Sequence, residues 1–462
     1  MSDTTSGFRL TKSGIVYLVA VVTALVLAFM GERDDRGIWI LGAAHVPFAF
    51  ALFVLVLLGV ALFHHHTLWV ALAGVLVITT YTAVFAPGHH WSPEQTHPGV
   101  LGHLYHEGPS TILNLLALLL GFALLAKYFE HSGVPDNLPR LLPKAPLASG
   151  FALLAIVWFI SSFLDNIAAA MIGGVMARSA FKGRVTVGYV AAIVAASNAG
   201  GAWSVVGDTT TTMMWIDGVK PLWVARGFVA SVVALLVGGF LSAAHQNKTQ
   251  PMEFHDSAER KPIDWMRVVI VVLILAGAIF ANWYSNDRQL KAPFNGPWWG
   301  VWGAIAIAAL IRKAAWEEIP GAAKGALFLL SLVWCASLMP VEQLPPASWQ
   351  TAFGLGFVSA VFDNIPLTKL ALEQGGYDWG MLAYTVGFGG SMIWFGSSAG
   401  VAISKDYPEA RNTGKYIKEG WPVALAYVVG FFVMLLTVGW SPHPSHSAVH
   451  APEKTAETAP AK

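Results

Sequence analysis

Long apolar stretches alternate with short polar ones along almost the whole chain. A helix of about 20 apolar residues crosses the ~30 Å hydrocarbon core of a bilayer. Because a helix satisfies its own backbone hydrogen bonds, as lipid requires, each long stretch is predicted to be a membrane-spanning helix. The stretches run from 15 to 30, 38 to 63, 68 to 85, 111 to 128, 147 to 164, 222 to 244, 265 to 283, 299 to 311, 323 to 339 and 421 to 440.

The composition agrees with this pattern, since only 12% of the 462 residues are charged and 55% are hydrophobic. Soluble proteins carry roughly 25% charged residues, and lipid penalises each charge. The net charge of +1 predicts no nucleic-acid partner, and the single Cys335 excludes an internal disulfide. The chain is therefore predicted to be an all-α polytopic membrane protein, with about 11–13 transmembrane segments.

A charged segment, 245–264, interrupts the apolar pattern near the middle of the chain and is the predicted linker between two halves. The first repeat is predicted at 110–244 and the second at 265–440. N-terminal spans and a His-rich loop precede them at 1–109. The segment 441–462 is rich in Pro, Ala, Thr and His, and a disordered tail is predicted there.

The two halves share two motifs in the same order. The Asp165-Asn166 pair, followed by Ile, recurs 198 residues later as Asp363-Asn364-Ile. Downstream of each pair stands Gly-Gly, then five residues, then Gly-Asp208 in the first half and Gly-Ser397 in the second. This repetition predicts that each half contributes a broken helix and a Gly-rich re-entrant or unwound segment.

The charges that follow each Asp-Asn pair predict that the two repeats are inverted. The loop after the first pair contains Arg178, Lys182 and Arg184 without an acid, whereas the loop after the second contains Glu373 and Asp378 without a basic residue. Basic loops stay in the cytoplasm. The first loop is thus predicted inside and the second outside.

The position of the Asp-Asn pairs predicts that they lie near the middle of the bilayer. Eleven apolar residues, 167–177, follow the first pair, and a helix of that length rises about 16 Å, roughly half the hydrocarbon core. Pro366 favours a break at the second pair. Asp165 and Asp363 are candidate ion ligands. Alternatively, these two aspartates have a structural role and cap the N-termini of half-helices. The two roles can coexist.

The Gly-rich segments supply oxygen atoms, which hard cations such as Na⁺ prefer. The first contains Asp208 and a run of four threonines. Two of the four threonine hydroxyls are expected to bond only to their own helix. The second segment has no counterpart of the Asp208 carboxylate. The further candidate ion-binding and proton-coupling residues are Asn166, Ser197, Asn198, Thr209, Asn364, Ser391, Ser397 and Ser398.

Two other features leave alternatives open. Lys369 either pairs with a site aspartate or binds an anionic substrate, or it pairs with Glu373 four residues on, at the membrane interface. The histidines of the first 109 residues gather at the ends of early spans and in one loop, without the convergent spacing of a metal site. No cofactor is predicted. The histidines concerned are 64–66, 89, 90, 97, 103 and 106; His45 also lies in this region.

The motifs resemble those of NhaD-type sodium/proton antiporters of the ion transporter superfamily, which also contains arsenite pumps and citrate and dicarboxylate carriers. The segment 197–215, SNAGGAWSVVGDTTTTMMW, carries the first-half likeness, and VFDNIPL at 361–367 with GGS at 389–391 carries the second. The resemblance implies a homodimer in the bacterial inner membrane, with a scaffold and a moving transport domain. The chain departs from the family pattern at alanines 168–170, where hydroxyl residues are typical, and at Lys369.

These observations predict a secondary active transporter that exchanges Na⁺ or Li⁺ for H⁺ by alternating access. A cation and protons would compete for Asp165, Asp208 and Asp363, because an empty, charged site is costly to move through the membrane. Asn166, Asn198, Asn364 and Thr209 would add neutral oxygens. A carrier for citrate, a dicarboxylate or another anion, coupled to Na⁺ or H⁺, is the alternative. The sequence contains no recognised catalytic or phosphate-binding motif, so no enzyme is predicted.

Overall fold

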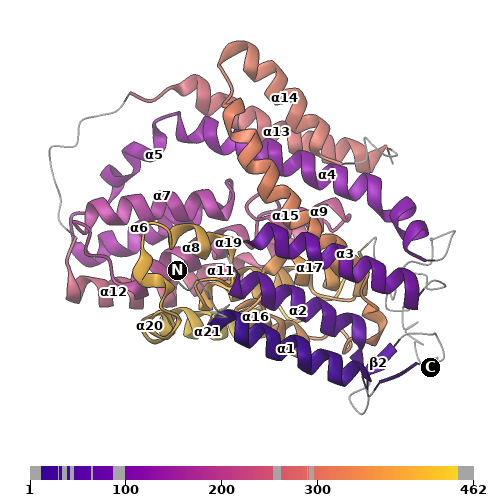
Figure 1. Ribbon diagram of the computed structural model, residues 1–462. Helices are drawn as coiled ribbons and strands as arrows, with labels where there is room; N and C mark the ends of the chain where they lie inside the picture. The colour runs from indigo at the N-terminus through magenta and orange to yellow at the C-terminus, as the bar shows by residue number, and fades with distance from the viewer. Residues whose placement is uncertain are drawn as a thin grey trace, which may run out of the picture.

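The computed structural model describes residues 12–29, 31–33, 39–41, 46–63, 66–86, 99–252, 262–288, 290 and 296–445. Most of these residues are helical (Figure 1), which confirms the prediction of an all-α polytopic membrane protein. The described strands are three very short ones near the N-terminus.

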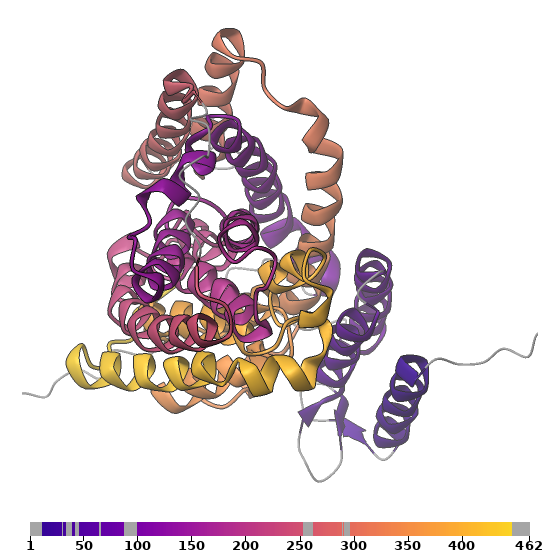
Figure 2. The ribbon, with the colours of Figure 1, turned by 90° about the vertical axis from the view of Figure 1, so that its left-hand side faces the viewer.

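The N-terminal region contains three helices, which Figure 2 shows in indigo to one side of the molecule. The prediction of one helix over 38–63 is wrong in its first part, because Trp39–Leu41 and Val46–Pro47 are strands and Pro47 is the N-cap of the second helix. Proline is tolerated at a helix start but not in its interior. The elements are α1 (Lys12–Phe29), β1 (Glu32–Arg33), β2 (Trp39–Leu41), β3 (Val46–Pro47), α2 (Phe48–Leu62) and α3 (Thr67–Phe85); β2 pairs antiparallel with both other strands.

The first half of the chain begins with a long helix, so the predicted boundary after residue 109 lies inside α4. Its elements are α4 (Gly99–Glu130), α5 (Val134–Asn137), η2 (Leu138–Leu141), α6 (Pro146–Ser161), α7 (Asn166–Ala180), α8 (Val187–Gly201), α9 (Thr209–Ile216), α10 (Pro221–Ala225), α11 (Phe228–Ala234), the π-helical turn η3 (Leu235–Gly239) and α12 (Phe240–Thr249).

The second half begins with two antiparallel helices, α13 and α14, at the top of Figure 1. Its elements are α13 (Trp265–Asp287), α14 (Trp298–Ile311), η4 (Trp316–Glu318), α15 (Ile319–Ser337), η5 (Val341–Gln343), α16 (Trp349–Ser359), α17 (Asn364–Gln374), α18 (Trp379–Gly389), η6 (Gly390–Met392), α19 (Ser398–Ile403), η7 (Pro408–Arg411), α20 (Thr413–Glu419) and α21 (Trp421–Thr437).

Five helical stretches of the described chain are long and apolar enough to cross a membrane, or six if α20 and α21, bent by 56°, form one broken span. The five are Thr67–Phe85, Ile112–Glu130, Pro221–Thr249, Trp265–Ser285 and Trp316–Ser337. Shorter apolar helices are Gly14–Val26, Phe48–Leu62, Pro146–Ser161, Val187–Gly201 and Trp298–Ile311. The protein is thus a multi-pass membrane protein, and the total of 11–13 segments stays a prediction.

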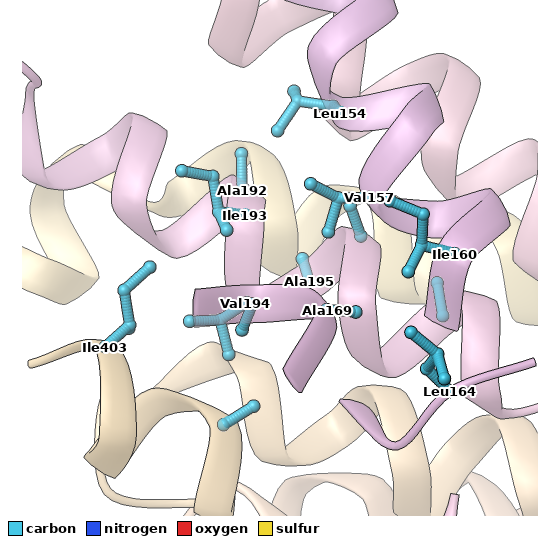
Figure 3. Close-up of a cluster of buried hydrophobic side chains, with 14 of the residues drawn as sticks. Leu154, Val157, Ile160, Leu164, Ala169, Ala192, Ile193, Val194, Ala195 and Ile403 are labelled. Atoms are coloured by element: carbon cyan, nitrogen blue, oxygen red, sulfur yellow. The ribbon is translucent and has the colours of Figure 1, made fainter. Parts of the chain in front are cut away.

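An apolar core joins the two halves beside the broken helices (Figure 3). Leu154 and Val157 of α6 face Ile193 of α8, and Ile403 of α19 enters the same cluster from the second half. Gly174 of α7 makes this close packing possible, since a Cβ there would lie 3.1 Å from Ile403 Cδ1. Helices α6, α7, α8 and α19 therefore pack as one unit.

The predicted linker and tail are partly ordered. Helix α12 extends through the first residues of the linker. Asp264, the last residue of the linker, accepts hydrogen bonds from the first turn of α13. Residues 253–261 lie outside the described part. In the predicted tail, Ser441 N donates to Asp378 Oδ2 (2.9 Å) and Ser445 Oγ to the Leu372 carbonyl (2.9 Å). A disordered tail thus cannot begin before residue 446, and the rest of it lies outside the described residues.

Candidate functional site

Each Asp-Asn pair stands where a helix breaks and a second begins. Asp165 is the N-cap of α7 and accepts from Ile167 N at 3.2 Å; Asp363 is the N-cap of α17 and accepts from Ile365 N at 3.0 Å. The two caps have nearly the same backbone, with φ −51° and ψ 140° in the first and φ −56° and ψ 141° in the second. Both carboxylates cap a helix N-terminus, as the structural alternative described.

The Gly-rich segments also form matching breaks. Asp208 is the N-cap of α9 (φ −144°, ψ 148°), and Ser397 is the N-cap of α19 (φ −141°, ψ 153°). In each half a glycine lets the backbone cross closely: a Cβ at Gly201 would lie 2.7 Å from the Gly207 carbonyl, and one at Gly390 would lie 2.6 Å from the Gly396 carbonyl. Such contacts leave no room for a side chain.

The first half gathers its polar side chains into one buried network. Asn166 Nδ2 donates to Asn198 Oδ1 (3.0 Å) and to Asp208 Oδ2 (3.3 Å). Asn198 Nδ2 donates to Ser391 Oγ (2.9 Å), which extends the network into the second half. Asp208, only 3% exposed, also lies close enough to Asp165 and Asp363 for their charges to interact. The charges of three carboxylates, two from the first half and one from the second, therefore act on one another in this region.

The second half has the same backbone but fewer polar partners. Asn364 is buried, and its Nδ2 has no hydrogen-bond partner in the described part of the chain. Gly387 stands where the first half has Asn198, and a Cβ on it would lie 3.6 Å from Asp208 Oδ2. Asp363 Oδ2 accepts from Ser398 Oγ at 3.4 Å. Ser397 Oγ serves its own helix by accepting from Gly400 N.

Some predicted hydroxyls do not enter this network. Ser197 Oγ donates to the Val194 carbonyl of its own helix. Thr211 and Thr212 donate to the carbonyl of Asp208, the N-cap of their own helix, and also to the Ser204 and Val205 carbonyls before that helix. Thr209 instead lines a cavity next to Asp208.

Two adjoining cavities reach the first-half site. A cavity of about 210 Å³ is lined by Asp165, Asp208 and Thr209, with α4 and α15 as its other walls. A larger one of about 750 Å³ shares Asp165 and follows α7 to Ser179. Together we call them the first vestibule. The larger cavity is also lined by three charged residues, Lys127, Glu130 and Glu318. The Lys127 ammonium lies 2.7 Å from the Glu130 carboxylate and 3.4 Å from that of Glu318.

Comparison with known proteins gives several similar transporters. The chain is 29% identical over 337 residues to sodium/proton antiporter 1 of Arabidopsis thaliana, covering 63% of this chain and 56% of that protein. It is 27% identical over 351 residues to the Na⁺/H⁺ antiporter NhaD of Vibrio parahaemolyticus (63% and 83% covered). It is 24% identical over 398 residues to NhaD of Vibrio cholerae serotype O1 (73% and 83%). No family model matches.

The resemblance to NhaD-type antiporters is confirmed. The chain spans little more than half the length of the Arabidopsis relative and most of the two bacterial ones.

Lys369, at which the chain departs from the NhaD-type pattern, is paired with Glu373 on α17. The side chains are only 5% and 4% exposed. The predicted pairing is therefore present, and it is enclosed in protein. The Lys369 ammonium is thereby neutralised by a neighbouring carboxylate on its own helix.

The histidines form no metal site in the described residues, where no group of three or more His, Cys, Asp or Glu is placed to bind one. His103 is buried, and its Nε2 lies 3.0 Å from Ser337 Oγ, so it joins α4 to α15. Histidines 64, 65, 89, 90 and 97 lie outside the described residues, as does the side chain of 106.

Sequence reasoning missed several residues that hold the candidate site together. Ser161 Oγ donates to the Ser197 carbonyl (2.6 Å), and Ser359 Oγ donates to the Val386 carbonyl (2.6 Å), one in each half. Both serines stand four residues before the Asp-Asn pairs, so an alignment of the two repeats contains this signal. Tyr416 OH donates to the Ser391 carbonyl (3.2 Å) and has no such repeat signal.

Proposed function

We propose that this protein is a secondary active antiporter that exchanges Na⁺, or Li⁺, for H⁺ by alternating access. The observation that carries the proposal is the pair of carboxylates, Asp165 and Asp208, that line the first vestibule beside a network of buried amides. The charge of Asp363 also acts on Asp208 from the second half. The names of the similar proteins support the choice of ions. The inner membrane and a homodimer are proposed with it.

The chemistry follows from the cost of charge in a buried site. A cation and a proton each neutralise a carboxylate, and a site that carries neither is costly to move across the membrane. Asn166, Asn198 and Thr209 line or adjoin the carboxylates and would supply neutral oxygens to a hard cation. Exclusive binding of cation or protons then couples the two fluxes in opposite directions.

The proposed access path in this conformation is the first vestibule. It follows α7 toward the basic loop that contains Arg178, Lys182 and Arg184, which the positive-inside rule assigns to the cytoplasm. We therefore assign this conformation to the inward-open state. The charged residues Lys127, Glu130 and Glu318 would stand at its entrance.

The anion carrier is the less favoured alternative. Its main support in the sequence was Lys369, and that ammonium already has Glu373 as its ion-pair partner. Three carboxylates near one another also repel an anionic substrate. The similar proteins are named as cation antiporters.

The decisive variant is Asp208→Asn, which keeps the size of the side chain but removes its charge. In proteoliposomes with an internal pH dye, adding Na⁺ should move protons in the parent and not in the variant, because the site loses a carboxylate for which cation and proton compete. Glu409→Gln, an exposed carboxylate outside the site, is the control and should exchange normally. Full exchange in Asp208→Asn would reject the role of Asp208.

A further inference from the structure

The matching helices α7 and α17 have different surroundings. Helix α7 exposes one side to the first vestibule, whereas every residue of α17 is buried. Helix α17 packs directly against α15, while the larger cavity separates α7 from the C-terminal end of α4. One broken helix thus borders an open path and the other a closed contact.

Helix α17 has charged residues at positions where the matching helix α7 has apolar ones. Counted from the Asp-Asn pairs, Lys369 holds the position of Met171, and Glu373 holds that of Val175. Both Met171 and Val175 line the first vestibule, and Val175 is 65% exposed. Lys369 and Glu373 therefore occupy the side of α17 that corresponds to the vestibule side of α7.

The residue between them shows what this side of α17 contacts. Leu370, which matches the vestibule-lining Ile172, belongs to a buried apolar cluster with Leu332, Cys335 and Ala336 of α15. We call this contact between α15 and α17 the seam. The Lys369–Glu373 ion pair is thus enclosed in protein on a surface where the matching helix is open.

We propose that the seam is the closed form of a second vestibule, and that Lys369 and Glu373 form a charged gate on its wall. The inference rests on the proposed alternating access, which requires a path to the opposite side of the membrane. The loop after α17 has no basic residue, so this path leads to the exterior. In the outward-open state the ion pair faces water on the path of the cation.

The gate has a definite energetic sign. A buried ion pair can lose more hydration than its attraction returns, and replacing both partners by apolar residues is often neutral or stabilising for the buried state. Removing one partner leaves a charge in the seam without its ion pair, which destabilises the buried state. The double apolar variant should therefore favour the closed seam, and the single variant should favour its opening.

Two matched cysteine reporters, each in a Cys335→Ala background, test whether the seam opens to the exterior. Leu370→Cys places a thiol in the seam, and Ile172→Cys places one at the matching position in the first vestibule. A membrane-impermeant maleimide is applied to inside-out and right-side-out vesicles in the presence of Na⁺. We expect Ile172→Cys to react from the cytoplasmic side and Leu370→Cys to react, more slowly, from the exterior.

The gate is then altered in the Leu370→Cys background. Lys369→Met with Glu373→Val, which copies the first half, should slow labelling, and Lys369→Met alone should speed it, each by roughly tenfold or less. The charge swap Lys369→Glu with Glu373→Lys keeps an i,i+4 ion pair and should stay within about twofold of the parent. As a control, the same substitutions at Lys369 and Glu373 are made in the Ile172→Cys background. A change in the labelling rate of that reporter would indicate a general loosening of the fold.

The proposal is overturned if Leu370→Cys never reacts from the exterior, or if the single and double variants shift its labelling in the same direction. It is also overturned if the changes speed both reporters alike, as a merely structural ion pair would. Na⁺-driven proton movement is measured on the same vesicles. Exchange without exterior labelling rejects the gate alone, whereas exterior labelling without exchange supports the gate and rejects the proposed ions.

Discussion

Asn166 and Asn364 occupy matching places in two broken helices, yet one is fully engaged and the other is not. Asn166 donates to Asn198 and Asp208, whereas the Asn364 Nδ2 has no partner in the described residues. The cause lies in the neighbouring Gly-rich segments, which supply Asn198 and Asp208 in the first half but Gly387 and Ser397 in the second. The same backbone thus builds two chemically different half-sites.

The comparison teaches that symmetry of the fold and asymmetry of the site are compatible. The backbone angles of the matching caps agree within a few degrees, so the break itself goes with an oxygen-bearing N-cap, Asp or Ser, and with closely packed glycines. The charge and hydrogen bonds depend on single side chains that can differ between halves. At this N-cap the first half has the Asp208 carboxylate, and the second half has the neutral Ser397.

The largest effect is expected from making the first half resemble the second. Asp208→Ser should lower Na⁺-dependent proton movement by more than about 100-fold, because it removes a carboxylate from the site. The control is Ser397→Ala at the matching position of the second half. It removes only an N-cap hydroxyl, whose loss costs about 1 kcal/mol of helix stability, so exchange should persist. Both are assayed in proteoliposomes with a pH dye. Equal activity of the two variants would contradict a functional asymmetry.

A smaller, separable effect is expected on stability. Asn166→Ala removes two buried hydrogen bonds and should lower the free energy of unfolding by roughly 1–3 kcal/mol, because Asn198 and Asp208 lose a donor. Asn364→Ala removes no such bond and should change it much less. Thermal unfolding of the detergent-solubilised protein without Na⁺, followed by tryptophan fluorescence, compares them. Equal shifts would show that the two asparagines are equally engaged.

The smallest effect is expected at Gly387, where the second half approaches Asp208. Gly387→Ala adds a methyl group about 3.6 Å from Asp208 Oδ2, an ordinary contact, so the protein should fold. Because an apolar group then covers one side of the carboxylate, the Na⁺ concentration for half-maximal exchange should rise roughly two- to fivefold. Gly354→Ala, whose methyl meets no atom within 4 Å, is the control. An unchanged Na⁺ dependence would place the ion on another side of Asp208.

The candidate site was visible in the sequence to the extent that it is local. An aspartate before a short apolar helix, repeated 198 residues later, predicted both breaks, and both aspartates are N-caps. The strands Trp39–Leu41 and Val46–Pro47 lie where a helix was predicted, because apolar composition does not distinguish a strand from a helix over so few residues. The pairing of Lys369 with Glu373 was foreseen from i,i+4 spacing, but its burial was not.

The sequence by itself predicted the all-α membrane fold and the helix breaks at Asp165 and Asp363, because hydropathy, N-caps and glycine spacing act over a few residues. Only the tertiary structure decided which polar groups meet and which broken helix faces a cavity. The contacts of Asn166 with Asn198 and Asp208 span 32 and 42 residues, and that of Asn198 with Ser391 spans 193. Such pairs form through the packing of whole helices, which local patterns do not encode.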